Sequence, residues 1–148
     1  FFEERLLGEG GFGYVYLVTD EFGKQYALKK LNIQETSQLQ AIKRELNYWQ
    51  NFNNHPNIIK LLSFDYNEKV ALILMEYSPE GNLFKYINDE FIEKNLYIKE
   101  EKALSIFKQI VSAVNHIHSC KIENKTIQHR NDFFYFRRAI YKEKFVCT

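Results

Sequence analysis

The sequence predicts an α+β fold in which five β-strands and one inserted helix are followed by a helical region. In the first half, runs of β-branched and aromatic residues alternate with short polar turns, which is typical of strands. All six glycines fall within the first 81 residues, and four of them crowd into residues 8–13. After a break at residues 78–81, apolar residues recur at helical spacing instead.

The first three strands are predicted on either side of the glycine cluster and of one tight turn. Residues 2–7 precede the cluster and residues 14–18 follow it. Residues 20–24 have the composition of a hairpin turn, because Asp and Gly tolerate the backbone angles that such turns need. Residues 25–31 then supply the third strand.

A helix is predicted between the third and fourth strands. Its apolar residues recur on one face, and they are Leu39, Ile42, Leu46 and Trp49. Thr36 or Ser37 is expected to cap its N-terminus, and the Asn-Asn-His-Pro-Asn sequence at residues 53–57 ends it.

Two further strands and two helices complete the prediction. The strands occupy residues 58–65 and 70–77, joined by a polar turn. Helices follow over residues 82–92 and 99–119. The second helix has an apolar stripe made of Ala103, Phe107, Ile110, Val114 and Ile117.

Composition limits the function only weakly. The 148 residues suit one domain, and the formal net charge of +1 gives no argument for nucleic acid or an anionic membrane as a partner. No apolar run reaches the length of a membrane span. Cys120 and Cys147 form neither a disulfide framework nor a metal motif, which favours an intracellular, cytoplasmic location. The first residue is Phe1 rather than Met, which suggests a fragment of a longer protein.

The glycine cluster has the pattern Gly8-x-Gly10-x-x-Gly13, a candidate phosphate-binding loop. Glycine lets backbone N–H groups approach phosphate oxygens without a Cβ in the way. A dinucleotide-binding loop would open a helix at the third glycine, whereas Gly13 is expected to open a strand. A Walker A loop would end in Gly-Lys-Ser/Thr, which is missing here. A glycine-rich hairpin without a ligand stays open as an alternative.

A lysine follows the glycine cluster across the predicted hairpin. Ala27 and Lys29 lie on one face of their strand, because strand side chains alternate, and Lys30 points the other way. A small residue leaves room for a flat base, and the ammonium group can reach phosphates. The alternative is an ordinary, solvated strand lysine.

These segments, in this order and spacing, resemble the protein kinase domain, over roughly residues 1–122. The finer details of the glycine loop and the last helix are similar to the Numb-associated group of serine/threonine kinases. The segments that carry the resemblance are residues 7–15 and 26–29, Arg44-Glu45, residues 55–59, 72–77 and 81–83, and residues 106–119.

The resemblance implies a fold and a division of the chain. It implies a kinase-like N-lobe over residues 1–77, with a five-stranded antiparallel sheet and the helix known in the family as helix C. A hinge at 78–81, helices D and E of an incomplete C-lobe at 82–122 and a divergent tail at 123–148 would follow.

The resemblance also implies roles for individual residues. Lys29 would hold the α- and β-phosphates of ATP, with Glu45 as its ion-pair partner. Met75 would guard the back of the adenine pocket, and the backbone of Glu76 and Ser78 would bind the base. The remaining ATP-binding residues would be Leu7, Gly8, Glu9, Gly10, Gly11, Phe12, Gly13, Val15 and Ala27. Two plainer alternatives are that Met75 is a core residue and Glu45 a solvated carboxylate.

The sequence departs from the kinase pattern after residue 122. His129-Arg130 is similar to the catalytic-loop pair, but Asn131 stands where the catalytic Asp is expected, and Asn cannot act as a base. Neither Asp-Phe-Gly nor Ala-Pro-Glu follows, so the Mg²⁺ site is incomplete and this chain is expected to be inactive alone. The basic and aromatic residues of the tail resemble no kinase segment.

The first functional hypothesis is therefore the ATP-binding portion of a serine/threonine protein kinase domain, using ATP and Mg²⁺ and acting on an unidentified protein substrate. The alternative is a non-catalytic, pseudokinase-like nucleotide-binding or scaffold module. Because the apolar stripe of the last helix has few partners, the isolated chain is expected to be marginally stable or to associate.

Overall fold

The computed structural model describes residues 1–10, 13–79 and 83–120 of the chain, which form two compact units. The first unit comprises Phe1–Asn53 and Lys60–Tyr77. The described part of the second comprises Asn54–Ile59 together with residues 78–79 and 83–120. The chain therefore leaves the first unit for six residues and then returns to it.

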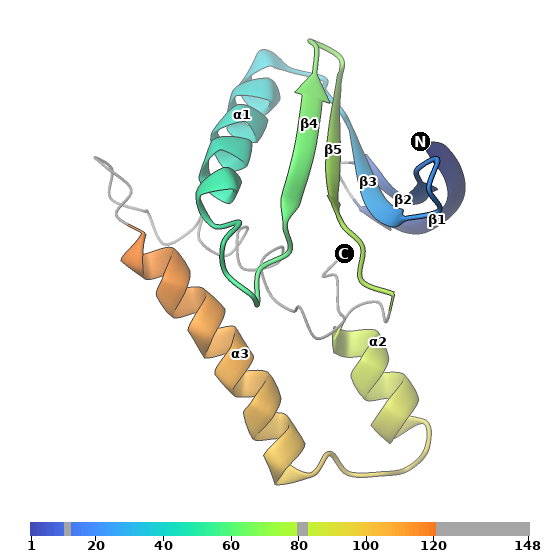
Figure 1. Ribbon diagram of the computed structural model, residues 1–148, viewed down its shortest axis with the longest axis vertical. Helices are drawn as coiled ribbons and strands as arrows, with labels where there is room; N and C mark the ends of the chain where they lie inside the picture. The colour runs from blue at the N-terminus through green and yellow to red at the C-terminus, as the bar shows by residue number, and fades with distance from the viewer. Residues whose placement is uncertain (11–12, 80–82, 121–148) are drawn as a thin grey trace. The chain divides into compact units, whose positions relative to one another are not determined.

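The first unit contains a five-stranded sheet in the order β1-β2-β3-β5-β4, and all neighbouring strands are antiparallel (Figure 1). This confirms the predicted five-stranded antiparallel sheet. The strands are β1 (Phe2–Gly10), β2 (Gly13–Thr19), β3 (Gln25–Asn32), β4 (Leu61–Tyr66) and β5 (Val70–Glu76).

Two predicted strand boundaries were wrong. β1 continues to Gly10 instead of ending at residue 7, because its last residues pair with the first residues of β2. β4 begins at Leu61 rather than at residue 58. Ile58 instead lies in a turn, where its N–H donates to the His55 carbonyl over 3.2 Å.

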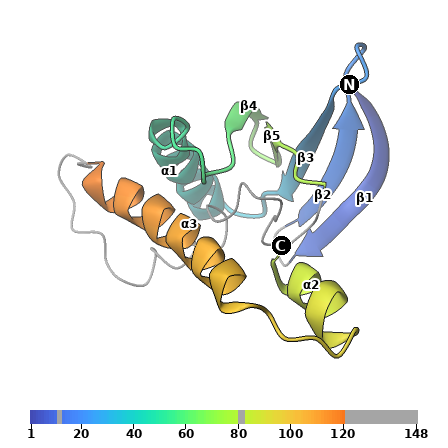
Figure 2. The same cartoon turned by 60° about the horizontal axis from the view of Figure 1, so that its bottom comes forward.

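The register of β1 on β2 is interrupted between Glu3 and Arg5 and again between Leu6 and Gly8. Such β-bulges bend a strand and increase its twist. β1 accordingly curves along its length in the view of Figure 2. The bulge before Gly8 falls at the start of the glycine cluster.

The β2–β3 hairpin turn is organised by Asp20. Its carboxylate accepts the N–H groups of Phe22 and Lys24, each over 2.9 Å, and the Tyr26 hydroxyl over 2.8 Å. The Lys24 N–H hydrogen bond, with smaller help from Tyr26 and Phe22, lowers the pKa of Asp20. The turn predicted at residues 20–24 is thus confirmed.

The predicted helix is α1 (Thr36–Asn51), but its N-terminal cap differs from the prediction. The N-cap residue is Glu35, and not Thr36 or Ser37. The Gln38 side chain accepts the N–H groups of Gln34 and Glu35, which closes a capping box one residue earlier than expected.

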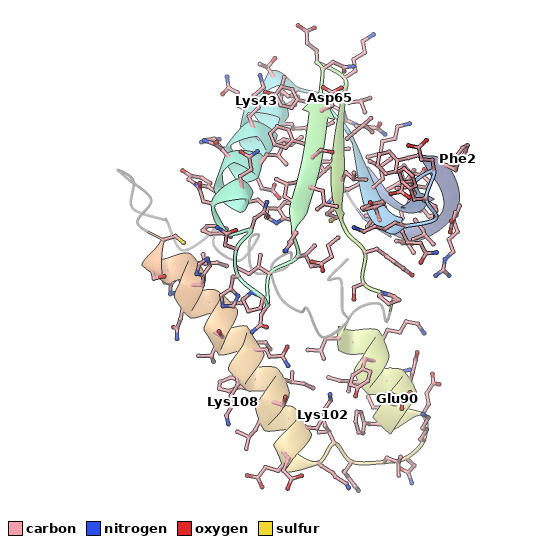
Figure 3. The ribbon with its side chains drawn as sticks, viewed as in Figure 1. Phe2, Lys43, Asp65, Glu90, Lys102 and Lys108 are labelled. Atoms are coloured by element: carbon pink, nitrogen blue, oxygen red, sulfur yellow. The ribbon has the colours of Figure 1, made fainter. Side chains whose placement is uncertain are left out.

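α1 lies beside β4 (Figure 1). The Lys43 ammonium group of α1 sits 4.7 Å from the centre of the Tyr66 ring of β4, and Figure 3 labels Lys43 and the neighbouring Asp65 at the same end of the unit. Apolar residues from α1 and the sheet are buried in this unit: Leu17, Val18, Ala27, Leu31, Ile33, Leu46, Trp49, Phe52, Leu61, Ala71, Ile73 and Met75.

The described part of the second unit is helical. It contains α2 (Leu83–Ile87), which continues into the π-helical turn η1 (Asn88–Ile92), and the long helix α3 (Glu100–Ser119). Ile106 of α3 is buried in a cluster with residues that precede and follow it, namely Leu83, Tyr86, Ile98 and Ile110.

One residue of the predicted α3 stripe was wrong. Phe107 is 61% exposed, whereas its neighbour Ile106 is 7% exposed and Ala113 is fully buried. The buried stripe is therefore centred one residue earlier and turns Phe107 outward with Leu104 and Val111. No helix among the described residues is both long and apolar enough to cross a membrane.

Candidate functional site

One face of the sheet collects most of the residues that the sequence singled out. Val15 pairs with Lys29, and Ala27 pairs with Met75 on the neighbouring strand. Residues that pair directly across antiparallel strands share a face, as do residues two apart along one strand. Val15, Ala27, Lys29 and Met75 therefore lie on the same face, as predicted for Ala27 and Lys29.

Helix α1 lies on that same face. The Lys43 ammonium group of α1 lies over the Tyr66 ring of β4. Tyr66 pairs with Ala71 of β5, and Ala71 pairs with Leu31 of β3. Leu31 is two residues from Lys29 on β3, so it shares the face of Lys29. The sheet face that displays Lys29 is therefore the face that α1 covers.

Glu45 sits on the inner side of α1. It is half-buried, while Lys43 and Arg44 just before it are exposed. Glu45 is also adjacent to the buried Leu46 and one turn before the buried Trp49. This burial argues against the alternative that Glu45 is an ordinary solvated carboxylate; its pairing with Lys29 stays a prediction.

Lys29 and Lys30 differ as the strand pattern predicts. Lys29 is half-buried, whereas Lys30 is exposed on the opposite face. The pair offers an internal comparison, because the same side chain occurs in two environments on adjacent positions of one strand.

Ala27 and Met75 form the floor of this face. Ala27 is fully buried and Met75 is 4% exposed. Because Ala27 pairs with Met75 on one side and with Leu17 on the other, a larger side chain at position 27 would meet close neighbours. Met75 packs as a core residue in the structure, and its predicted role beside a base remains a prediction.

The described glycines of the loop differ in how much space surrounds them. A Cβ added to Gly13 would overlap the main-chain carbonyl of Lys30, and the φ of Gly13 is +151°, which favours glycine. A Cβ on Gly10 would meet nothing within 4 Å. Gly13 thus lets β2 approach β3, and the open side of Gly10 leaves room for a ligand.

Two predicted base-binding residues are Glu76, the last residue of β5, and Ser78, which follows β5. The Glu76 N–H already donates to the Lys60 carbonyl over 3.0 Å. Ser78, in the second unit, has a buried hydroxyl oxygen that finds no hydrogen-bond partner among the described residues. A buried unpaired hydroxyl is unusual and calls for a partner.

The other predicted residues fall into two groups. Leu7 and Gly8 are half-buried, and Glu9 is exposed at the end of β1. Gly11, Phe12, the His129–Asp132 segment and the basic tail with Arg137, Arg138, Lys142 and Lys144 lie outside the described residues. Within residues 1–10, 13–79 and 83–120, no group of three or more His, Cys, Asp or Glu side chains could hold a metal ion.

Two polar clusters near the end of α1 were not predicted from the sequence. The Asn53 side chain donates to the Leu61 carbonyl over 2.7 Å and accepts the Leu61 N–H over 2.8 Å. His55, in the second unit, contacts α3 through Ser112 and His116. A polar segment with a proline was interpreted only as a helix breaker, because its partners lie far away in the sequence.

Comparison with known proteins defines the class. The sequence profile of the protein kinase domain matches residues 1–133, which is most of the chain. Together with the five-stranded antiparallel sheet and its helix, this match shows that the chain belongs to the protein kinase domain family.

Individual relatives are serine/threonine kinases. A probable serine/threonine-protein kinase of Dictyostelium discoideum is 37% identical over 137 residues, covering 87% of this chain and 16% of the relative. A second from the same organism is 34% identical over 140 residues, covering 86% and 38%. The serine/threonine-protein kinase Nek1 of Mus musculus is 37% identical over 131 residues, covering 86% and 10%.

These relatives support the serine/threonine kinase class, and they do not favour the alternative of a non-catalytic, pseudokinase-like nucleotide-binding or scaffold module. The chain spans between 10% and 38% of the length of these three relatives. The finer resemblance to the Numb-associated group stays a prediction.

Proposed function

We propose that this chain supplies the nucleotide-binding portion of a serine/threonine protein kinase domain and binds ATP on the sheet face that carries Lys29. The observation that supports the proposal most is the juxtaposition on one face of a half-buried lysine, a fully buried alanine and the open glycine Gly10 of the loop. An ATP site needs room for a flat base, a cation for the phosphates and a glycine loop whose backbone can approach them. The buried alanine, the lysine and Gly10 correspond to these three needs.

In this proposal, Lys29 binds the α- and β-phosphates and Glu45 holds the lysine in place. The half-burial of both side chains supports that pairing, because water screens a partly buried ion pair less than an exposed one. Leu7, Val15 and Ala27 pack against the adenine ring, and the backbone of residues 8–13 covers the phosphates.

The hydrogen-bonding state of Glu76 decides how it can contact the base. The Glu76 N–H donates to the Lys60 carbonyl, so the main-chain group of Glu76 that we propose for the amino group of adenine is its carbonyl oxygen. The contact of the Ser78 backbone with the base stays a prediction, because Ser78 belongs to the second unit.

Magnesium plays a limited part in the proposal. Mg²⁺ would accompany the phosphates of ATP, as it does generally in protein kinases. The groups of this chain that we propose for the phosphates are the Lys29 ammonium group and the loop N–H groups.

The test is calorimetric titration of the 148-residue chain with MgATP, beside Lys29→Ala and the matched control Lys30→Ala. Losing a hydrogen bond to a charged group removes about 1.5–3 kcal/mol, so Lys29→Ala is expected to weaken ATP binding roughly 10-fold to 100-fold. Lys30→Ala should bind as the parent does, because Lys30 is exposed on the other face. If the parent chain does not bind ATP, or if both variants bind it equally well, the proposal is wrong.

A further inference from the structure

The most connected polar cluster outside the proposed nucleotide site joins His55 to helix α3. The His55 Nε2 atom lies 3.1 Å from the Ser112 hydroxyl, and its Nδ1 atom accepts the Asn57 N–H over 3.1 Å. The His55 ring also stacks on the His116 ring, with centroids 4.8 Å apart and planes inclined by 28°.

These contacts fix the protonation state of His55. A main-chain N–H can only donate, so Nδ1 must present its lone pair to Asn57. The ring is therefore neutral, with its one proton on Nε2, where it donates to Ser112. A second proton, placed on Nδ1, would turn the acceptor into a donor facing another donor.

Among the described residues, the titratable group that acts on His55 disfavours its charged form. His116 is the titratable neighbour, and Cys120 lies beyond it with Sγ 3.7 Å from His116 Nε2. Desolvation first and the charge on His116 second lower the pKa of His55 below its usual 6.5.

We infer that His55, Ser112 and His116 form an acid-sensitive clasp, which holds Asn54–Ile59 on α3 when His55 is neutral and weakens when His55 gains a proton. The clasped segment is covalently continuous with α1 on one side and β4 on the other. One further tie, from the Asn57 side chain to the Gln109 carbonyl over 3.2 Å, does not involve the ring and survives.

The direction of the pH dependence follows from the lowered pKa. The unfolded chain takes up a proton near pH 6.5, before the folded chain does. The stabilisation by neutral His55 is therefore complete above pH 6.5 and is lost as the pH falls below that value. The inference does not depend on nucleotide binding and can fail or succeed independently of it.

The test measures amide hydrogen exchange of residues 54–59 in the 148-residue chain at pH 7.5 and pH 5.5 (roughly one unit on either side of the usual histidine value), corrected for the intrinsic effect of pH. Loss of the Asn57 bond is expected to speed exchange about fivefold in acid. His55→Asn keeps an acceptor for the Asn57 N–H that cannot be protonated, so its exchange should not respond to acid. His118→Asn, at an exposed histidine of the same helix, should respond as the parent does.

A second measurement does not require a folded variant. Histidine ring NMR on the parent chain should show the Nε2–H tautomer for His55 and a titration midpoint below 6.5. His116→Phe, which keeps a stacked ring without a charge, should raise that midpoint. An Nδ1–H tautomer, a midpoint at or above 6.5, or acid-sensitive exchange in His55→Asn would overturn the inference.

Discussion

At the scale of single residues, the glycine cluster shows that two glycines of one motif can have different structural roles. Gly13 is required by its own backbone, because its φ of +151° favours glycine and a Cβ would overlap the Lys30 carbonyl. Gly10 has no such neighbour, and its lack of a side chain matters only to whatever approaches the loop.

We therefore predict opposite consequences for two alanine substitutions. Gly13→Ala should lower the free energy of unfolding by about 3 kcal/mol, because strain and steric overlap add. Gly10→Ala should change it by less than about 1 kcal/mol. Urea unfolding of both variants measures the difference; equal midpoints would show that Gly13 does not adopt the observed conformation.

At the scale of secondary-structure elements, the junction between α1 and β4 depends on one side chain. Asn53 makes two hydrogen bonds to the main chain of Leu61 and thereby fixes where β4 begins. Main-chain groups that lose partners in a part-buried position become unsatisfied, which adds to the loss of the bonds themselves.

Asn53→Ala is therefore expected to destabilise the chain by about 2 kcal/mol. The control is Asn54→Ala, at an exposed position one residue later, which should change the free energy of unfolding by less than about 0.5 kcal/mol. Chemical denaturation followed by circular dichroism distinguishes them. Similar losses from the two substitutions would contradict a specific role for Asn53.

The sheet was predictable because its signals are local, whereas the two polar clusters were not. Period-two patterns and the Asp20 turn lie within a few residues of each other, and they placed Ala27 and Lys29 on one face. The errors at Phe107 and at the start of β4 came from packing and from side-chain contacts over longer separations. His55 contacts Ser112 across 57 positions, a relation that no local pattern encodes.

At the scale of the whole molecule, the exposed side of α3 governs how the chain behaves in solution. Leu104, Phe107 and Val111 are 45%, 61% and 38% exposed and recur at helical spacing. An apolar stripe of this kind in contact with water favours association.

We expect the 148-residue chain to associate as its concentration rises, and Phe107→Gln to reduce this association. Lys108→Gln, at the adjacent exposed position, is the control and should have little effect. Sedimentation velocity over a concentration series measures both. A parent chain that stays monomeric throughout the series would contradict the expectation.

The segment Asn54–Ile59, which belongs to the second unit although it lies between parts of the first, also implies an order in which native contacts form during synthesis. The sheet unit is complete in sequence at Tyr77, but Asn57 contacts Gln109, 52 residues further along, and His55 contacts Ser112. When Tyr77 leaves the ribosome, the strands and α1 can already assemble, while the α3 residues that His55 and Asn57 contact have not yet been made. His55 and Asn57 gain their contacts with α3 only after residues 109–116 emerge, so a nascent chain should pass through a stage in which its sheet is formed and this one loop is open to proteases.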